Sequence, residues 1–303
     1  MFRGAAAEHK PGAPASFGPA GWIGRTLRRS RLAAAWAATP ALRAAEAGYT
    51  STMNAILAGK IALVTGGGRG IGASIARALA TAGARVFVCG RSKPDLDAIA
   101  REIGGVALPL DLSDRKHTDE VLGSVGHVDV LVNNAGAAES AALDRTTDAL
   151  WDRILELDAT APFRVARALV PSMIANKWGR VINVASNAGV SGYGYSTAYC
   201  AAKHAMVGMT RALAIDLART GVTINALCPG WVDTQMAQEA VARIAAKTGR
   251  SEDQARTQLA TMSPQHRMIS PDEVAYAALM LCGDGARGIH GQTIVIDGGA
   301  VLK

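Results

Sequence analysis

The sequence predicts a single α/β domain built on a doubly wound parallel sheet of seven strands, with helices on both faces. Two observations carry this prediction. From residue 53 onward, short β-branched runs alternate with longer helical patterns, which is typical of right-handed βαβ units. The strand-like runs also lack apolar–polar alternation, as expected when both faces of a strand are buried.

The alternating elements run in one series, without an internal repeat or a linker after residue 53. We expect strands at 61–65, 85–89, 106–110, 128–132, 180–185, 223–228 and 293–296. We expect helices at 70–83, 93–103, 115–125, 148–176, 197–219, 234–262 and 271–283. One uninterrupted series predicts one domain over residues 53–303.

Composition excludes several classes of protein. With 303 residues, of which 49% are hydrophobic, the chain can bury a sizeable core and is not mainly disordered. The sequence contains no run of about 18 uncharged apolar residues, so we expect no membrane-spanning helix. The four cysteines form no Cys-x-x-Cys pair, and the six histidines show no metal-ligand spacing. We therefore expect no disulfide scaffold, no bound metal, no membrane partner, and a reducing, cytoplasmic location.

The net charge of +7 is concentrated at the amino end. Residues 1–52 carry seven basic and two acidic side chains, a net charge of +5, which leaves +2 for residues 53–303. A main domain so close to neutrality gives little reason to expect a nucleic-acid partner.

Residues 1–52 are rich in Ala, Gly, Pro and Arg and show no sustained period. We expect them to be disordered or loosely helical. The favoured interpretation is an upstream extension, with Met53 as the real start. An Arg-rich targeting peptide is an alternative, and the pair Arg28 and Arg29 gives weaker support to an export signal.

The first predicted strand runs into a glycine-rich loop, Thr65 to Gly72, followed by a helical pattern. Glycines let the backbone turn tightly and approach a ligand, and the helix N-terminus offers N–H groups to a pyrophosphate. The loop predicts a dinucleotide site that includes Gly66, Gly68, Arg69, Gly70, Ile71 and Gly72.

The end of the second strand bears on cofactor choice. An acidic residue there would bind the ribose 2′-hydroxyl of NAD, but residues 89–92 contain none. Arg91 can face a 2′-phosphate, and Arg69 lies in the neighbouring loop. NADP(H) is therefore favoured, NAD(H) is the alternative, and either arginine could instead be a solvated surface group.

A wider set of motifs resembles one family. Tyr199-x-x-x-Lys203 follows Ser186 at the end of a predicted strand, and the glycine loop precedes Asn133-Asn134-Ala135-Gly136, with Pro229-Gly230 further on. In this order the motifs resemble the short-chain dehydrogenases/reductases, over about residues 57–299. The resemblance implies a Rossmann-type fold and an NAD(P)-dependent oxidoreductase.

The catalytic expectation has its own physical logic. Tyr199 and Lys203 are four residues apart on a predicted helix and share a face. A phenol, with a pKa of about 10, is a weak acid–base group at neutral pH unless positive charge stabilises its phenolate. The resemblance implies that Tyr199 exchanges the proton, that Ser186 orients the carbonyl, and that Lys203 also holds the nicotinamide ribose.

The resemblance also implies further cofactor contacts. Asp111, with Leu112 beside it, should bind the adenine amino group, although Asp111 could instead cap the helix at 115–125. Asn134, Ala135 and Gly136 should line the adenosine side. The nicotinamide should be bordered by Pro229, Gly230, Val232 and Thr234.

One residue departs from the family pattern. Asp158 occupies the position where the family usually has Asn, whose main-chain carbonyl holds a water that links the lysine to solvent. That carbonyl survives the change, but a carboxylate can only accept hydrogen bonds. We count Asp158 among the catalytic candidates and expect Asp158→Asn to be mild. Cys200, beside Tyr199, reads as an ordinary core cysteine, although a redox switch is conceivable.

Residues 235–262 are long, helical and polar, so we expect a lid over the nicotinamide. By analogy, the substrate is a 3-oxoacyl thioester or a similar ketone. The alternatives are oxidation of a secondary alcohol such as 3-hydroxybutyrate, a steroid or a sugar, and a non-catalytic NADP-binding regulator. The resemblance implies that the helices at 148–176 and 197–219 pair across subunits, so we expect a homotetramer, with a dimer second. Apolar residues beyond the needs of one sheet face agree with this; they are Ile154, Phe163, Val165 and Leu169.

Overall fold

The computed structural model describes residues 55–302, so the expectations for residues 1–52 lie outside the described residues. Seven parallel strands form one sheet in the order β3-β2-β1-β4-β5-β6-β7. They are β1 (Ile61–Thr65), β2 (Arg85–Gly90), β3 (Val106–Pro109), β4 (Val130–Asn133), β5 (Gly179–Val184), β6 (Val222–Pro229) and β7 (Thr293–Ile296). This confirms the predicted doubly wound sheet.

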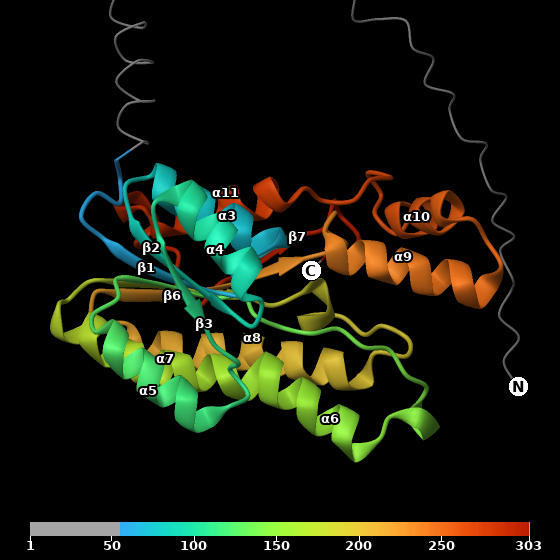
Figure 1. Cartoon of the computed structure of the whole chain (residues 1–303), viewed down its shortest axis with the longest axis horizontal. Helices are drawn as coiled ribbons and strands as arrows, with labels where there is room; N and C mark the ends of the chain where they lie inside the picture. The colour runs from blue at the N-terminus through green and yellow to red at the C-terminus, as the bar shows by residue number, and fades with distance from the viewer. Residues whose placement is uncertain (1–54, 303) are drawn as a thin grey trace, which may run out of the picture. The chain divides into compact units, whose positions relative to one another are not determined.

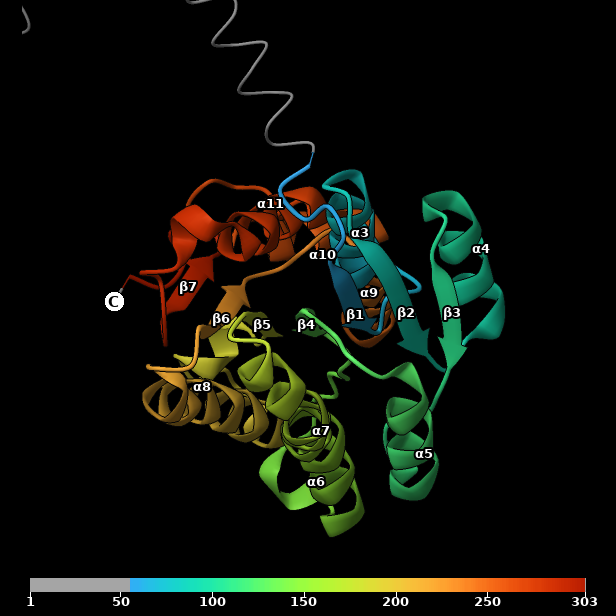
Figure 2. The ribbon, with the colours of Figure 1, turned by 90° about the vertical axis from the view of Figure 1, so that its left-hand side faces the viewer.

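Helices cover both faces of the sheet, as Figures 1 and 2 show. On one face lie α3 (Gly70–Thr81), α4 (Lys93–Ile103) and α11 (Pro271–Cys282). On the other lie α5 (Arg115–Val125), α7 (Ala161–Ala175) and α8 (Thr197–Leu217). A separate hydrophobic core fills each interface between helices and sheet, because every central strand is apolar on both sides.

The strand order reverses between β1 and β4. The chain leaves β1 toward one edge of the sheet and leaves β4 toward the other, so a crevice opens beyond the carboxyl ends of these two strands. Open α/β sheets bind their ligands at such a point. The glycine loop after β1 and Asn134 after β4 both lie there.

Two predicted helices are divided in the structure. The expected helix at 148–176 is α6 (Asp148–Leu155), a π-helical turn at Glu156–Thr160, and α7. The expected lid is two helices, α9 (Gln235–Thr248) and α10 (Glu252–Ala260). The break in the lid has a local cause: Gly249 ends α9 at a left-handed φ of 69°, and Ser251 begins α10 through a capping box with Gln254.

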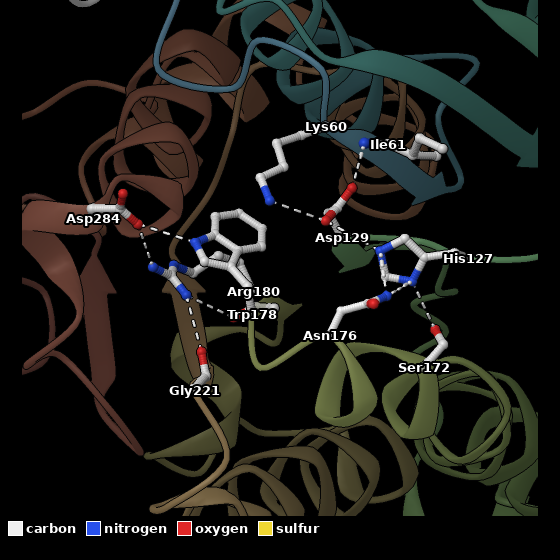
Figure 3. Close-up of polar contacts among 11 residues, drawn as sticks. Lys60, Ile61, His127, Asp129, Ser172, Asn176, Trp178, Arg180, Gly221 and Asp284 are labelled. Carbon is white, nitrogen blue, oxygen red and sulfur yellow. Dashed lines mark hydrogen bonds and ion pairs between the residues drawn. The ribbon is translucent and has the colours of Figure 1, made fainter.

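The amino ends of the strands are tied together at the edge opposite the crevice (Figure 3). The carboxylate of Asp129, just before β4, accepts hydrogen bonds from the Ile61 amide at 2.9 Å and the Lys60 ammonium at 3.2 Å. Arg180 at the start of β5 donates to Asp284 at 3.0 Å. These contacts join β1 to β4 and anchor β5 to the turn at Asp284–Ala286, at the end of the sheet away from the ligand site.

Among the residues that the structure describes, no helix has the length and apolar character needed to cross a membrane. Within the same range, no three His, Cys, Asp or Glu side chains lie close enough together to hold a metal ion.

Candidate active site

The glycine loop joins β1 to α3 in a backbone path that side chains would block. Gly66 has a φ of +64°, in the left-handed region. A Cβ on Gly72 would lie 2.2 Å from the Gly66 carbonyl oxygen, so only glycine fits there. No side chain caps the first turn of α3, and no acidic residue lies in it. Its N–H groups and positive dipole end therefore suit an anionic ligand.

Asn134 holds this loop from the neighbouring strand. Its side-chain amide donates to the carbonyl oxygens of Thr65 at 2.9 Å and Gly66 at 3.2 Å. The amides of Asn134 and Ala135 both donate to the Thr65 hydroxyl. Asn134, expected on the adenosine side, thus positions the loop through its side chain.

The residues after β2 and β3 lie close to one another. Arg91 is exposed, and it is near enough to Asp111 to help lower the pKa of that carboxyl, although the Ser113 hydroxyl and amide do more. Asp114, not Asp111, caps α5 by accepting the His117 amide at 3.0 Å. The alternative interpretation of Asp111 as the helix cap was therefore wrong. Leu112 is buried in the core, so its side chain is not available to a ligand.

The lid begins directly against the glycine loop. A Cβ on Gly70 would lie 3.1 Å from the Thr234 methyl group. The Arg69 guanidinium donates to the side-chain oxygen of Gln235 at 2.8 Å, so it contacts the lid. Val232 is buried and forms a bridge with Ile269, which joins the two ends of the lid at its base.

The three expected catalytic groups come together beyond the carboxyl end of β5. Ser186 follows β5 in extended backbone, and its hydroxyl accepts the Ala188 amide at 3.1 Å. Tyr199 and Lys203 project from the first half of α8, with the Lys203 ammonium 5.6 Å from the centre of the Tyr199 ring. Lys203 also donates to the Val184 carbonyl at 3.3 Å. Serine, tyrosine and lysine therefore form one group.

Asp158 belongs to this group through its side chain. The carboxylate is fully buried, and its Oδ2 lies 3.2 Å from the Lys203 Nζ. Its Oδ1 accepts the Ala137 amide at 2.8 Å. Asp158 lies in the π-helical turn, where the Ala161 amide bonds back to the Glu156 carbonyl. Such one-turn bulges are frequent at functional sites.

The electrostatics of the group are coupled. Burial raises the pKa of Tyr199, the nearby Asp158 raises it further, and Lys203 acts to lower it. Burial alone would lower the pKa of Lys203, but Asp158 and Tyr199 outweigh burial and raise it. Burial raises the pKa of Asp158, and Lys203 opposes that rise. We infer an ionised pair, because each partner favours the charged form of the other.

A cavity of about 120 Å³ lies under the lid and was missed from the sequence. Asn187, directly after Ser186, lines it, as do Tyr193, Trp231 and, at the end of the lid, Met262. The available signal was Trp231, an aromatic residue directly after Pro229-Gly230. A larger cavity of about 370 Å³ between α5 and α7 contains none of the predicted site residues.

Comparison with known proteins agrees with this geometry. Residues 60–245 match the family model described as short chain dehydrogenase. The chain belongs to the short-chain dehydrogenase family. Membership confirms the expected resemblance and makes the chain an oxidoreductase of the class that acts on hydroxyl and keto groups.

The relatives include proteins named as dehydrogenases and proteins named as reductases. The chain is 38% identical to a D-beta-hydroxybutyrate dehydrogenase of Cupriavidus necator, over 82% of this chain and 100% of the relative. It is 35% identical to a 3-oxoacyl-[acyl-carrier-protein] reductase of Escherichia coli, over 80% of this chain and 98% of the relative. A solved structure of an actinorhodin polyketide ketoreductase variant with NADPH superposes with a TM-score of 0.77, at 36% identity, covering 80% of this chain and 97% of that one.

Proposed function

We propose that this short-chain dehydrogenase is an NADPH-dependent reductase of 3-oxoacyl thioesters or closely similar ketones. The grouping of Ser186, Tyr199 and Lys203 is the observation that carries the proposal. Asn187, the residue after Ser186, lines the cavity under the lid. The relatives named as reductases of 3-oxoacyl groups and polyketides support it.

The residues present fit an NADP(H) molecule. The first turn of α3, which has no side-chain cap and no acidic residue, suits the pyrophosphate. Arg91 is positioned at the end of β2 to bind a 2′-phosphate, with Asp111 beside it for the adenine. When bound, this cofactor supplies the hydride.

The protein side of the reaction is proton transfer and orientation. Ser186 donates a hydrogen bond to the substrate oxygen, and the Tyr199 hydroxyl gives that oxygen its proton. Lys203 has three N–H donors. One is directed to Val184, and the ammonium lies 3.2 Å from the Asp158 Oδ2 as an ion pair, so a donor is left for a ribose hydroxyl. Its ammonium also stabilises the phenolate that remains on Tyr199.

The cavity favours a neutral substrate over a small hydroxy acid. Its two charged lining residues are Arg267 and Asp297. Arg267 is already held by Glu273 through two hydrogen bonds of 2.7 Å. Asp297 would repel a substrate carboxylate. An uncharged acyl thioester can use the apolar wall formed by Tyr193, Trp231 and Met262 without that penalty.

The test compares one acyl group with and without the charge. We expect kcat/KM for NADPH oxidation to be at least about tenfold higher with the N-acetylcysteamine thioester of acetoacetate than with free acetoacetate, a difference of about 1.4 kcal/mol. Cofactor absorbance measures both rates. A preference for free acetoacetate, or for oxidation of 3-hydroxybutyrate, would identify the enzyme as a hydroxy-acid dehydrogenase instead.

Two alternatives follow from other observations. The same proton transfer run backward oxidises a secondary alcohol, as the name of the Cupriavidus relative suggests for that protein. A non-catalytic NADP-binding regulator would have no need of the intact serine, tyrosine and lysine.

The free thiols, of which Cys89, Cys228 and Cys282 are buried, suit the reducing cytoplasm that we propose as the location of the protein.

Three of the four apolar residues expected at a subunit interface lie inside the subunit. Ile154, Val165 and Leu169, taken as candidates for an interface, are buried inside the subunit against its own helices and sheet. Phe163 remains 42% exposed. It lies with the exposed Trp151 and Ile174 along α6 and α7, while Tyr276 and Met280 are exposed on α11. Two separate apolar surfaces are what a homotetramer with two kinds of interface needs.

We therefore expect a solution mass close to four times the 31.3 kDa of the chain. Phe163→Glu should reduce the mass to that of a dimer, because it places a charge in one interface and leaves α11 unchanged. Light scattering at micromolar concentration measures both. A monomeric mass for the unmodified protein would contradict the proposed assembly.

A further inference from the structure

The carboxylate of Asp158 is the one feature of the catalytic group that the family pattern does not supply. It is fully buried, as is nearly all of the Lys203 side chain that it contacts. A carboxylate moved from water to such a position is strongly disfavoured unless a charge and hydrogen bonds compensate it. Lys203 and the Ala137 amide provide both. The pair is thus built into the site.

The surroundings of Asp158 fix where the carboxylate points. The π-helical turn places residue 158 against α8. On its other side, a Cβ on Gly136 would lie 3.1 Å from the Asp158 Oδ2. The Ala137 amide holds the second oxygen at 2.8 Å. With Oδ1 bonded to the Ala137 amide, Oδ2 faces the Lys203 ammonium at 3.2 Å.

We propose that Asp158 is a positioning residue, which anchors the Lys203 ammonium through a buried ion pair and sets the pH range over which Tyr199 exchanges its proton. The inference rests on the proposed function, because it assigns the proton of the reaction to Tyr199. It differs from the family pattern, in which a main-chain carbonyl at this position holds a water.

Few other groups can set this range. Glu156, on the same turn, is paired with Arg115 on the outside of the protein. The other polar or titratable groups that face the ion pair and the Tyr199 phenol carry no charge of their own at neutral pH. They are Cys200 on α8, Cys228 on β6, Ser186 after β5 and the Ala137 amide after β4. Lys203 and Asp158 are thus the two charges nearest Tyr199.

The direction of the effect follows from these two charges. The ammonium favours the phenolate of Tyr199 and the carboxylate disfavours it. In the native protein the carboxylate offsets part of the field of the lysine, so Tyr199 keeps its proton to higher pH. Asp158→Asn removes the negative charge with almost no change of shape. The phenolate then forms at lower pH.

The test titrates Tyr199 in the free protein, without substrate or cofactor. Ultraviolet difference spectra record phenolate formation in the native protein and in Asp158→Asn. From each spectrum we subtract that of the same protein carrying Tyr199→Phe, so that the other four of the five tyrosines cancel. We expect the Tyr199 titration of Asp158→Asn to begin at least about one pH unit lower. Because no reaction is involved, this readout is independent of whether the proposed substrate is correct.

The pH–rate profile gives the second readout. The alkaline limb of ketone reduction should move to lower pH in Asp158→Asn by a similar amount, while the rate at the optimum stays within about tenfold of native, because proton transfer itself retains its donor. Asp152→Asn is the matched control: it removes a carboxylate from the exposed side of α6 and should shift neither readout.

Asp158→Ser also removes the charge and should shift the titration in the same direction, which keeps the test available if the asparagine variant folds poorly. An unchanged titration in both variants, or a shift to higher pH, would overturn the proposal. A loss of more than a hundredfold at the optimum would also do so, since Asp158 would then take part in the chemistry itself.

Discussion

Tyr199→Phe is expected to lower turnover by about 10²–10⁴-fold, the range typical of a positioned acid–base group, and to leave NADPH binding nearly unchanged. The substitution keeps the ring, which packs beside Ala198 and Ala202 of the same helix. It removes the hydroxyl that would protonate the substrate oxygen. The loss should appear in kcat rather than in KM, because the hydroxyl acts in the transition state.

The matched control is Tyr195→Phe. Tyr195 is 72% exposed and lies four residues earlier in the chain, so loss of its hydroxyl should leave kcat unchanged. Cofactor absorbance gives the rates, and quenching of protein fluorescence on titration with NADPH gives the affinity. Native turnover in Tyr199→Phe would show that another group delivers the proton.

Local sequence patterns predicted the framework of the fold and much of the site. The bounds of β1, β7, α4 and α5 agree with those expected, because each element has a continuous apolar or periodic pattern between clear turn signals. The glycine loop and the Tyr-x-x-x-Lys pair were also predictable, since each is a short motif whose geometry comes from one turn or one helix.

Long-range contacts were not predictable in the same way. Asp158 and Lys203 are distant in the chain, and their contact depends on a π-helical turn that adds a residue to one turn of helix. Hydrophobic periodicity does not register such an insertion, so the sequence predicted one helix over 148–176. The cavity beside Ser186 is similar, because its walls come from Asn187, Trp231 and Met262 on three separate segments.

The sequence predicted correctly which apolar residues are buried, but not always what covers them. Val165 and Leu169 are apolar, and the sequence placed them at a subunit interface because one face of the sheet did not account for them. In the structure they pack in the core between α7, the sheet and neighbouring helices. A periodic pattern shows which residues avoid water, but not whether the same chain or a second copy covers them.

Arg91→Asp is expected to reverse the cofactor preference. In the proposed cofactor site the native guanidinium makes charge-assisted hydrogen bonds to a 2′-phosphate, and loss of such bonds costs about 1.5–3 kcal/mol. The aspartate adds repulsion to this loss. Arg91 also partly neutralises Asp111, as its effect on the pKa of that carboxyl indicates, so the variant presents two carboxylates to the phosphate. We expect kcat/KM with NADPH to fall by about 10²-fold or more.

NADH responds differently because its ribose carries a hydroxyl where NADPH carries the phosphate. A carboxylate at position 91 can accept a hydrogen bond from that hydroxyl, so kcat/KM with NADH should hold or improve. Steady-state rates with each cofactor at a fixed, saturating ketone measure the ratio. Arg219→Asp is the control, since it reverses the charge of an exposed arginine between α8 and β6, four strands away from β2 in the sheet, and should leave the ratio unchanged. An equal loss with both cofactors would mean that Arg91 supports the loop rather than the phosphate, and a native preference for NADH would mean that neither Arg69 nor Arg91 selects NADP(H).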